Sequence, residues 1–423
     1  MKILLLGSGG REHAFAWKLR QSPRCSKLYI APGNAGTATS GENVALDIGD
    51  NAAIHDFVVE NTVGMVVVGP EAPLVNGVQN YLRRMRSTSH VPVIGPSLQG
   101  ARLEGSKSYA KKFMQEFGIP TAGYREFHSA KAGAAIHFIQ KKASLPIVLK
   151  ADGLAAGKGV VICQSREEAV AEIREMLEGK FGQASRKVVV EEFLSGIEFS
   201  VFALTDGESY QILPTAKDYK RIGEGDTGPN TGGMGAVSPP PFVDADLMKK
   251  VEERIIRPTV QGLKKRGIEY QGFLFFGLIR VGDDPYVIEY NCRMGDPETE
   301  VVLPRLKNDL VELFLAVADR RLSEVRIEED ERATTTIILA AGGYPGDYAK
   351  GMAINGIDKV KDSIVFHAGT KAAGNQVLTN GGRVLAITSY GSTFREALAL
   401  SNKNAATIDF EGKYYRRDIG YDL

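Results

Sequence analysis

The sequence is poor in cysteine and histidine, and neither residue has the spacing of a metal cluster. Its three cysteines, Cys25, Cys163 and Cys292, lie far apart and form no CxxC pair. Its six histidines form no HxxH or HExxH pattern. The sequence therefore indicates neither a zinc cluster nor a disulfide framework, and we expect the cysteines to be reduced thiols.

The chain also lacks an excess of charge of either sign and a long apolar run. Its 52 lysines and arginines almost balance 51 aspartates and glutamates, so we expect no nucleic-acid partner, because such partners select a strongly basic face. No run approaches the roughly 20 apolar residues of a membrane span. The opening run Ile3–Leu6 is too short for a secretion signal. We expect a cytoplasmic protein that does not bind membranes.

What the sequence does contain is enough apolar residues, 43% of 423, for about three domains. Residues 1–103 alternate short apolar strands with helices, which predicts an α/β domain with a parallel sheet. Residues 104–327 predict a larger α+β domain, with a small mobile lobe at about 121–190. Residues 328–423 predict a small α+β cap domain. Between Gly223 and Gly235 we expect a long unstructured loop of functional importance.

Three loops at the carboxyl edge of the first sheet are candidates for a ligand site. Gly7–His13 joins the first strand to a helix, where backbone N–H groups form an anion site. Pro32–Thr37 and Gly69–Leu74 follow the next two strands, at the edge where open α/β folds bind ligands. A dinucleotide is disfavoured because Glu12 replaces the third glycine of its motif and Ala31 stands where a ribose-binding acid belongs. Ordinary structural turns are the alternative.

The segment Lys150–Gly159 is rich in glycine and carries a lysine at its start and another near its end. It differs from a Walker A loop because Gly153 and Gly157 enclose three residues and Gly159 follows Lys158. It joins one strand to another, and such a hairpin can fold over a triphosphate and donate backbone N–H groups. A plain β-turn is the alternative, but it does not explain three glycines.

Acidic residues end the apolar strand that begins at Val188. The segment Glu191–Leu194 can offer backbone groups to an adenine edge, and Glu198, four residues further on, can accept from ribose hydroxyls. An acidic surface patch is the alternative interpretation of this segment.

Period-two spacing places Glu289, Asn291 and Arg293 on one face of a strand. Buried charges are costly unless they are partnered, and carboxylate and amide oxygens suit Mg²⁺, which also takes phosphate oxygens. Arg293 would then neutralise a transferring phosphoryl group, with Asp296 and Glu298 orienting it. An internal ladder of salt bridges is the alternative.

Taken together, these motifs resemble the ATP-grasp superfamily and, within it, the phosphoribosylamine–glycine ligase family. The resemblance covers nearly the whole chain as an ordered series of motifs. These are Gly9–Ala14, Ala31–Thr37, Gly69–Leu74, Leu103–Lys107, Lys150–Gly159, Glu191–Leu194, Asp226–Gly235, Glu289–Thr299, Ala340–Tyr348, Phe366–Lys371 and Thr379–Leu385. It implies an N-terminal parallel-sheet (pre-ATP-grasp) domain, a two-lobed ATP-grasp domain and a C-terminal cap domain.

The resemblance also implies an activity. ATP phosphorylates the carboxylate of glycine, and the amine of 5-phosphoribosylamine attacks the glycyl phosphate. The products are glycinamide ribonucleotide, ADP and phosphate, in de novo purine (IMP) biosynthesis. The implied ligands are ATP, Mg²⁺ or Mn²⁺, glycine and 5-phosphoribosylamine, and we expect a monomer.

The resemblance carries roles over to individual residues. The implied ATP-binding residues are Lys107, Lys150, Gly157, Gly159, Glu191, Glu192, Leu194 and Glu198. The implied metal ligands are Glu289 and Asn291. The implied substrate-site residues are Gly9, Gly10, Asn34, Glu71, Asp218 and Arg293, and the implied catalytic residues are Arg293, Asp296 and Lys150.

This chain departs from the family pattern in two places. Many ATP-grasp enzymes carry a further metal-binding acid about twelve residues before the Glu-x-Asn pair, where this chain has Gly277. The segment Ala216–Arg221 differs from the usual Ser-Gln-Asp-His-Lys-Arg but keeps Asp218. Three other functions are considered: another ATP-grasp carboxylate–amine ligase or carboxylase of purine metabolism, a nucleotide-binding regulator without catalysis, and an NAD oxidoreductase.

Overall fold

The first hundred residues form a five-stranded parallel sheet with the order β3-β2-β1-β4-β5, as the alternating pattern predicts. The computed structural model describes residues 1–154 and 159–423. The strands are β1 (Lys2–Gly7), β2 (Lys27–Pro32), β3 (Glu42–Asn43), β4 (Met65–Val68) and β5 (Val93–Ile94). The helices of this part are α1 (Gly10–Leu19), α2 (Asn51–Glu60), α3 (Glu71–Val75), α4 (Val78–Arg84) and α5 (Leu98–Gly105).

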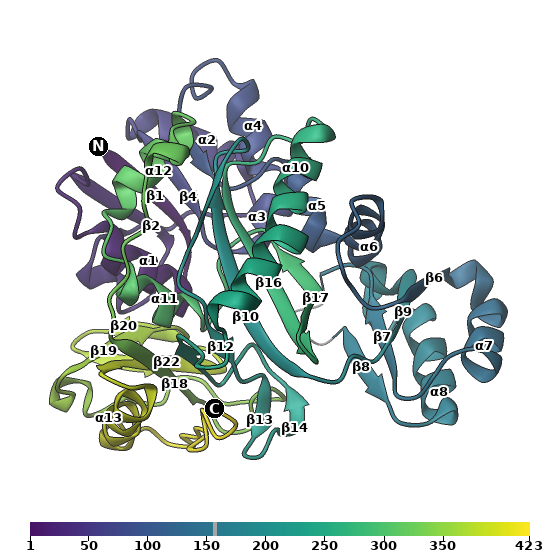
Figure 1. The fold of residues 1–423 in the computed structure, drawn as a ribbon. Coiled ribbons are helices and arrows are strands. Elements are labelled where there is room, and N and C mark those ends of the chain that lie inside the picture. The colour runs from purple at the N-terminus through teal and green to yellow at the C-terminus, as the bar shows by residue number, and fades with distance from the viewer. Residues whose placement is uncertain (155–158) are drawn as a thin grey trace.

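A small four-stranded lobe follows, and it projects to the right of the molecule in Figure 1. Its antiparallel sheet has the order β6-β9-β7-β8, and α7 and α8 complete its own apolar core. Its strands are β6 (Tyr124–His128), β7 (Ile147–Ala151), β8 (Val160–Cys163) and β9 (Lys187–Glu192). Its helices are α7 (Ala132–Lys141) and α8 (Arg166–Leu177), and α6 (Lys107–Glu116) leads into it.

The central antiparallel sheet has the order β11-β10-β16-β17. Its strands are β10 (Ile197–Thr205), β11 (Tyr210–Ile212), β16 (Gly272–Val281) and β17 (Asp284–Asn291). One long helical segment precedes β16: α9 (Ala245–Val251) and α10 (Arg257–Lys265) are joined by a π-helical turn. After β17 come α11 (Thr299–Arg305) and α12 (Leu310–Ala318).

A third large sheet crosses the predicted boundary at residue 328. Its order is β12-β15-β18-β22-β19. The C-terminal part supplies β18 (Ala333–Ala340), β19 (Ser363–His367) and β22 (Arg383–Gly391), together with the hairpin β20 (Thr370–Ala373) and β21 (Gln376–Thr379) and helix α13 (Phe394–Thr407). The central part supplies β12 (Lys217–Asp218) and β15 (Gly235–Ser238). The cap and the central domain are therefore joined by backbone pairing as well as by side chains.

The prediction of a long unstructured loop between Gly223 and Gly235 is wrong. This segment contains a hairpin of β13 (Arg221–Gly223) and β14 (Thr227–Asn230). The segment is rich in residues that favour turns, so its composition does not indicate the strand pairing. Residues near the C-terminus of the chain stabilise this pairing. The fully buried Arg416 pairs with Asp226 at 2.6 Å, and Tyr414 donates to the carbonyl of Ile222 at 2.7 Å.

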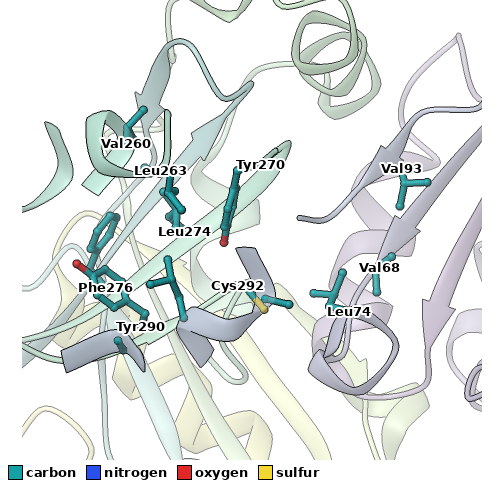
Figure 2. Close-up of a cluster of buried hydrophobic side chains, with 14 of the residues drawn as sticks. Val68, Leu74, Val93, Val260, Leu263, Tyr270, Leu274, Phe276, Tyr290 and Cys292 are labelled. Carbon is teal, nitrogen blue, oxygen red and sulfur yellow. The ribbon is translucent and has the colours of Figure 1, made fainter. Parts of the chain in front are cut away.

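The N-terminal and central sheets share one apolar core (Figure 2). Val68 and Leu74 from the N-terminal part and Leu274 and Phe276 from β16 belong to the same cluster of buried side chains. Burial of this shared surface fixes the carboxyl edge of the parallel sheet against the central sheet. No helix in the described part of the chain is both long and apolar enough to cross a bilayer.

Leu274, which is fully buried in this core, provides a test of its contribution. Leu274→Ala is expected to destabilise the folded chain by about 2–5 kcal/mol, because it removes buried carbon atoms and leaves a cavity. The matched control is Leu98→Ala, whose side chain is 45% exposed. Urea unfolding followed by circular dichroism should show a lower midpoint for Leu274→Ala alone. Equal midpoints for the two variants would contradict the shared core.

Candidate functional site

A buried cluster of two lysines and one glutamate lies where the small lobe faces the central sheet. Lys150 on β7 and Lys111 on α6 contact the same oxygen of Glu191 on β9, at 3.0 and 3.1 Å. Lys150 also donates to the carbonyl of Ile288 on β17 at 3.1 Å. Burial, with the nearby charge of Lys150, lowers the pKa of Lys111 to about 8. Two cations thus share one carboxylate, leaving positive charge for an anionic ligand.

Glu191 also has an oxygen that points away from these lysines. Its Oε1 is buried and has no hydrogen-bond partner among the described residues. A buried polar atom of this kind is costly unless a ligand or water satisfies it. The orphaned oxygen is therefore suited to accept a hydrogen bond from an N–H group of a ligand.

Lys107, at the start of α6, joins the glycine-rich segment to this cluster. Its ammonium donates to the carbonyl of Gly153 at 3.3 Å. Asp152 accepts from Ser106 and from the backbone of Ser108, the latter at 2.6 Å. Burial and the charge of Lys150 lower the pKa of Lys107. Gly159 is buried and its carbonyl accepts from β7, whereas Gly157 lies outside the described residues.

Glu289 and Asn291 lie on β17, as the period-two pattern predicts, whereas Arg293, which was expected on the same strand face, lies beyond the end of the strand at Asn291. Glu289 pairs with Gly277 on β16, and a Cβ at Gly277 would stand only 3.0 Å from Cγ of Glu289. The glycine that replaces the expected second acid thus makes room for the first one. A register shift next to this pair leaves Ile288 without a partner residue in the pairing of β16 with β17. The carbonyl of Ile288 accepts a hydrogen bond from Lys150 instead.

Arg293 has different partners from those that we predicted. It contacts Glu104 on α5 at 2.7 Å and Glu71 on α3 at 3.4 Å, whereas we expected Asp296 and Glu298 to orient it. Glu104 also accepts from the backbone N–H of Cys292 at 2.8 Å. Arg293 is thus held between the parallel sheet and β17, and its side chain is 16% exposed.

A second ion-pair cluster lies at the start of β10. Glu198 accepts from Lys220 at 2.7 Å, and Asp218 lies 3.9 Å from the same ammonium. The positive charge of Lys220 lowers the pKa of Glu198, whereas burial raises that of Asp218. The pKa of Lys220 is raised, because the charges of Asp218, Glu198 and Glu289 outweigh its burial. The charge of Glu289 therefore acts on the ammonium of Lys220 in this cluster.

Two further acids lie deep beneath the site. Burial and the charge of Asp218 raise the pKa of Glu298 to about 8. Glu300 is fully buried, and neither of its carboxyl oxygens has a hydrogen-bond partner in the described ranges. Burial raises the pKa of Glu300 well above its ordinary value. In both acids burial thus disfavours the charged carboxylate.

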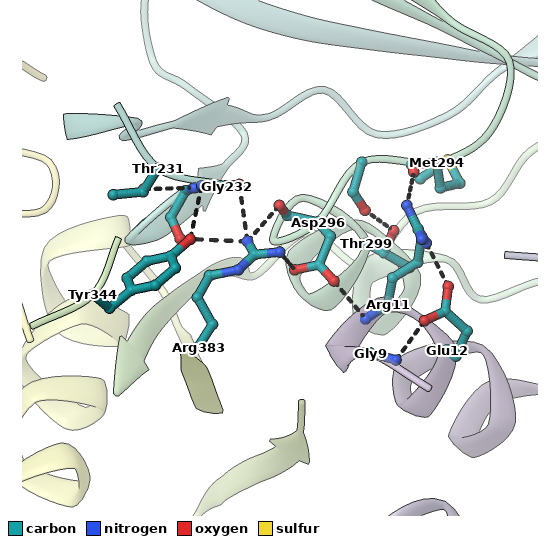
Figure 3. A network of polar contacts seen from close by, with 12 residues as sticks. Gly9, Arg11, Glu12, Thr231, Gly232, Met294, Asp296, Thr299, Tyr344 and Arg383 are labelled. Atoms are coloured by element: carbon teal, nitrogen blue, oxygen red, sulfur yellow. Dashed lines mark hydrogen bonds and ion pairs between the residues drawn. The ribbon is translucent and has the colours of Figure 1, made fainter. Parts of the chain in front are cut away.

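The N-terminus of α1 faces carboxylates of the chain itself (Figure 3). The N–H of Gly9 donates to Glu12 at 2.6 Å, and that of Arg11 donates to Asp296 at 3.3 Å. A Cβ at Gly9 would lie 3.1 Å from Asp296, and one at Gly10 would overlap Glu300. The two glycines therefore let acids from α11 and its preceding turn approach the helix end.

The other residues that were predicted to bind the substrate or adenine lie around the buried cluster of Lys150, Lys111 and Glu191. Asn34 donates to the carbonyls of Ser8 and His367, both at 2.8 Å, and accepts from Gly36, so its amide joins loops. Glu192 is exposed and accepts from the N–H of Gly123 at 2.7 Å. Leu194 is half-buried beyond the end of β9.

Sequence reasoning did not assign several residues that complete the site. These are Lys111, Glu104, Lys220, Glu300, Tyr344 and Arg383. Glu104 lies inside Leu103–Lys107, a segment that carried the family resemblance. Lys220 lies two positions after Asp218, in the segment that departs from the family pattern. Their positions next to Lys107 and Asp218 were an available signal. Tyr344 and Arg383 lie inside the resembling segments Ala340–Tyr348 and Thr379–Leu385. The partners of Arg383 lie 87 or more positions away, so no local pattern identifies them.

Glu289 and Asn291 suit a hard divalent cation. One carboxylate and one amide oxygen are few ligands, and Mg²⁺ commonly takes its others from phosphate and water. The described residues contain no group of three or more His, Cys, Asp or Glu side chains that could hold a metal ion. The donor set therefore fits a cation that arrives with a phosphate ligand.

Comparison with known proteins agrees with this geometry. The three parts of the phosphoribosylglycinamide synthetase family match in order: the N domain at residues 1–104, the ATP-grasp (A) domain at 105–299 and the C domain at 334–422. The chain is 47% identical to phosphoribosylamine–glycine ligase of Chlorobaculum tepidum over 99% of each chain.

Two solved structures have a similar fold. The phosphoribosylamine–glycine ligase of Thermotoga maritima has a TM-score of 0.84 at 36% identity, covering 99% of this chain and all of that one. The biotin carboxylase domain of 2-oxoglutarate carboxylase from Hydrogenobacter thermophilus has a TM-score of 0.72 at 16% identity, covering 99% and 92% of the two chains. The carboxylase shares the fold alone, whereas the resemblance found in the sequence is confirmed: the chain belongs to the phosphoribosylglycinamide synthetase family, an ATP-grasp family of ligases.

Proposed function

We propose that this protein joins glycine to 5-phosphoribosylamine with ATP, through a glycyl phosphate, and releases glycinamide ribonucleotide, ADP and phosphate. The observation that carries the proposal is the convergence of three sets of side chains, since Lys150 contacts the backbone of β17 and Arg293 follows that strand. Lys150 and Lys107 come from the small lobe and α6, Glu289 and Asn291 from β17, and Arg293 from the turn after it. This is the charge distribution that phosphoryl transfer to a carboxylate requires.

The nucleotide binds where the small lobe faces the central sheet. Lys107 and Lys150 bind the phosphates, together with backbone N–H groups of the segment that holds Gly157 and Gly159. The strand end Glu191–Leu194, with Glu192 at its edge, contacts adenine, and the orphaned oxygen of Glu191 accepts from its amino group. Glu198 accepts from the ribose hydroxyls.

Glu289 and Asn291 hold the divalent cation, Mg²⁺ or Mn²⁺, which neutralises phosphate charge when bound. Arg293, fixed by Glu71 and Glu104, stabilises charge that develops on the acyl phosphate. Lys150, from the small lobe, supplies a second cationic side chain for the transferring group.

The second substrate binds at the carboxyl edge of the parallel sheet. The turn at Gly9 and Gly10 takes the phosphate of 5-phosphoribosylamine, and Asn34 shapes this pocket by joining its loops. Glu71 and Asp218 complete the substrate site, and Asp296 lies between it and the reacting centre. The proposal includes the division of the chain into domains after residues 103 and 327, with a mobile lobe at 121–190. The monomeric state and the cytoplasmic location stay predictions of the sequence.

Glycyl phosphate hydrolyses in water, so the site must exclude solvent while the amine attacks. The raised pKa of Glu298, caused mainly by burial, is the signature of such a dry environment.

Glu289→Ala is expected to abolish ligation while leaving the fold intact, because it removes the charged ligand of the proposed cation site. Release of ADP should be measured with glycine and with bicarbonate, with 5-phosphoribosylamine generated in place. Asp283→Ala, at an exposed position near the start of the same strand, serves as the control. Wild-type turnover by Glu289→Ala would refute the metal role, and ADP release with bicarbonate in place of glycine would refute the ligase reaction.

Lys150→Met is expected to weaken ATP binding about 10- to 100-fold, because a charge-assisted hydrogen bond contributes about 1.5–3 kcal/mol. Calorimetric titration with ATP measures this loss. Lys112→Met is the control, since that lysine lies on α6 with a 54% exposed side chain. Equal affinity of the Lys150→Met variant and the wild type would remove Lys150 from the phosphate site.

Glu298→Gln is expected to change how stability depends on pH. A carboxyl group with a raised folded-state pKa favours folding when protonated, so its wild-type contribution is lost as pH rises from about 4.5 through about 8. The variant should therefore unfold at nearly the wild-type temperature at pH 5, and at a higher temperature than the wild type at pH 9. Parallel stability curves for the two proteins would contradict a raised pKa at Glu298.

A further inference from the structure

Arg383, the first residue of β22, extends from the C-terminal part of the chain toward Gly232 and Asp296 (Figure 3). One of its guanidinium nitrogens donates to the carbonyl of Gly232 at 2.8 Å and to that of Asp296 at 2.7 Å. Another lies 2.9 Å from the carboxylate of Asp296. One side chain thus ties the segment after β14 to the turn before α11.

Neighbouring groups hold Arg383 in this position. The hydroxyl of Tyr344 accepts from the N–H of Gly232 at 3.1 Å, and Gly382 has no room for a Cβ because the ring of Tyr344 packs against it. Gly233 likewise packs against Pro297. Packing around Gly382 and around Gly233 therefore restricts the position of the Arg383 side chain, which is only 19% exposed.

The same carboxylate of Asp296 reaches the N-terminus of α1. Its second oxygen accepts from the N–H of Arg11 at 3.3 Å and lies against Gly9. Arg383, Asp296 and the end of α1 therefore form one chain of contacts that joins the three parts of the molecule.

This arrangement has an electrostatic consequence for a phosphate ligand. A phosphate bound at the first turn of α1 would lie beside the carboxylate of Asp296, and two like charges at such a distance repel each other. A guanidinium that pairs with the carboxylate removes most of this repulsion. The repulsion would return if Arg383 lost its charge.

We propose that Arg383 is a positioning residue for the phosphorylated substrate: it neutralises Asp296 and holds it in place, so that the N-terminus of α1 can accept the phosphate of the ribosyl substrate. This inference rests on the proposed function. It assigns to the C-terminal part of the chain an indirect share in substrate binding, through Asp296 of the central part.

The test compares Arg383→Met, Arg383→Gln and Arg383→Lys with the wild type. We expect Arg383→Met to raise the KM for 5-phosphoribosylamine about 10-fold or more, while the KM for ATP stays within about twofold, since a charge-assisted pair contributes about tenfold or more in affinity. Arg383→Lys keeps the charge and should lie closest to the wild type. Arg383→Gln keeps an amide donor but no charge and should resemble Arg383→Met. Arg395→Met, at an exposed arginine on α13, is the control.

A second substitution separates charge neutralisation from a merely structural role. In the Arg383→Met background, Asp296→Asn should lower the KM for 5-phosphoribosylamine again, because the unneutralised charge is gone. Calorimetric binding of ribose 5-phosphate should follow the same order. Equal increases in the KM for ATP and for 5-phosphoribosylamine, an unchanged KM, or no recovery in the double variant would overturn the proposal. If the wild type does not release ADP in response to glycine, the proposed function itself fails, whatever Arg383 does.

Discussion

The pairing of β17 with neighbours on both of its sides is the constraint on which the rest of the structure depends. On one side it pairs with β16 and places Glu289 over Gly277. On its other side, the N–H of Val287 donates to Pro120 at 2.9 Å and its carbonyl accepts from Thr121 at 2.6 Å. These two residues begin the connection to β6. The strand that carries the proposed metal ligands is therefore also the support from which the small lobe extends.

This support explains why so many charges can be buried at one place. Two cations are held by a carboxylate from another element, Lys150 by Glu191 and Arg293 by Glu104. The pair of Lys220 with Glu198 is partly exposed. A buried ion pair contributes little net stability, because desolvation offsets most of the attraction. Its value here is positional, since a charged group fixed by a partner and by a rigid strand needs no reorganisation when a ligand arrives.

Sequence reasoning succeeded where the relevant pattern was local. Alternating apolar strands and helices predicted the parallel sheet, and period-two spacing placed Glu289 and Asn291 on one strand face, because both depend on neighbours in the chain. It failed for the partners of Arg293, which are 189 and 222 positions away. It also failed for the hairpin at Arg221–Asn230, whose turn-rich composition hides a pairing that distant residues stabilise. The roles assigned to individual site residues stay predictions, since no ligand tests them.

The C-terminal part shows that the boundaries of the domains and the boundary of the candidate site do not coincide. Its sheet continues into β15 and β12, which lead directly to Asp218 and Lys220. Because backbone hydrogen bonds join these strands, a shift of β18 would be transmitted to the pair of Lys220 with Glu198. The contacts of Arg383 act on the same segment from its other end, through Gly232 and Gly233. The cap is thus connected to the candidate site by two independent routes, one of backbone pairing and one of charge.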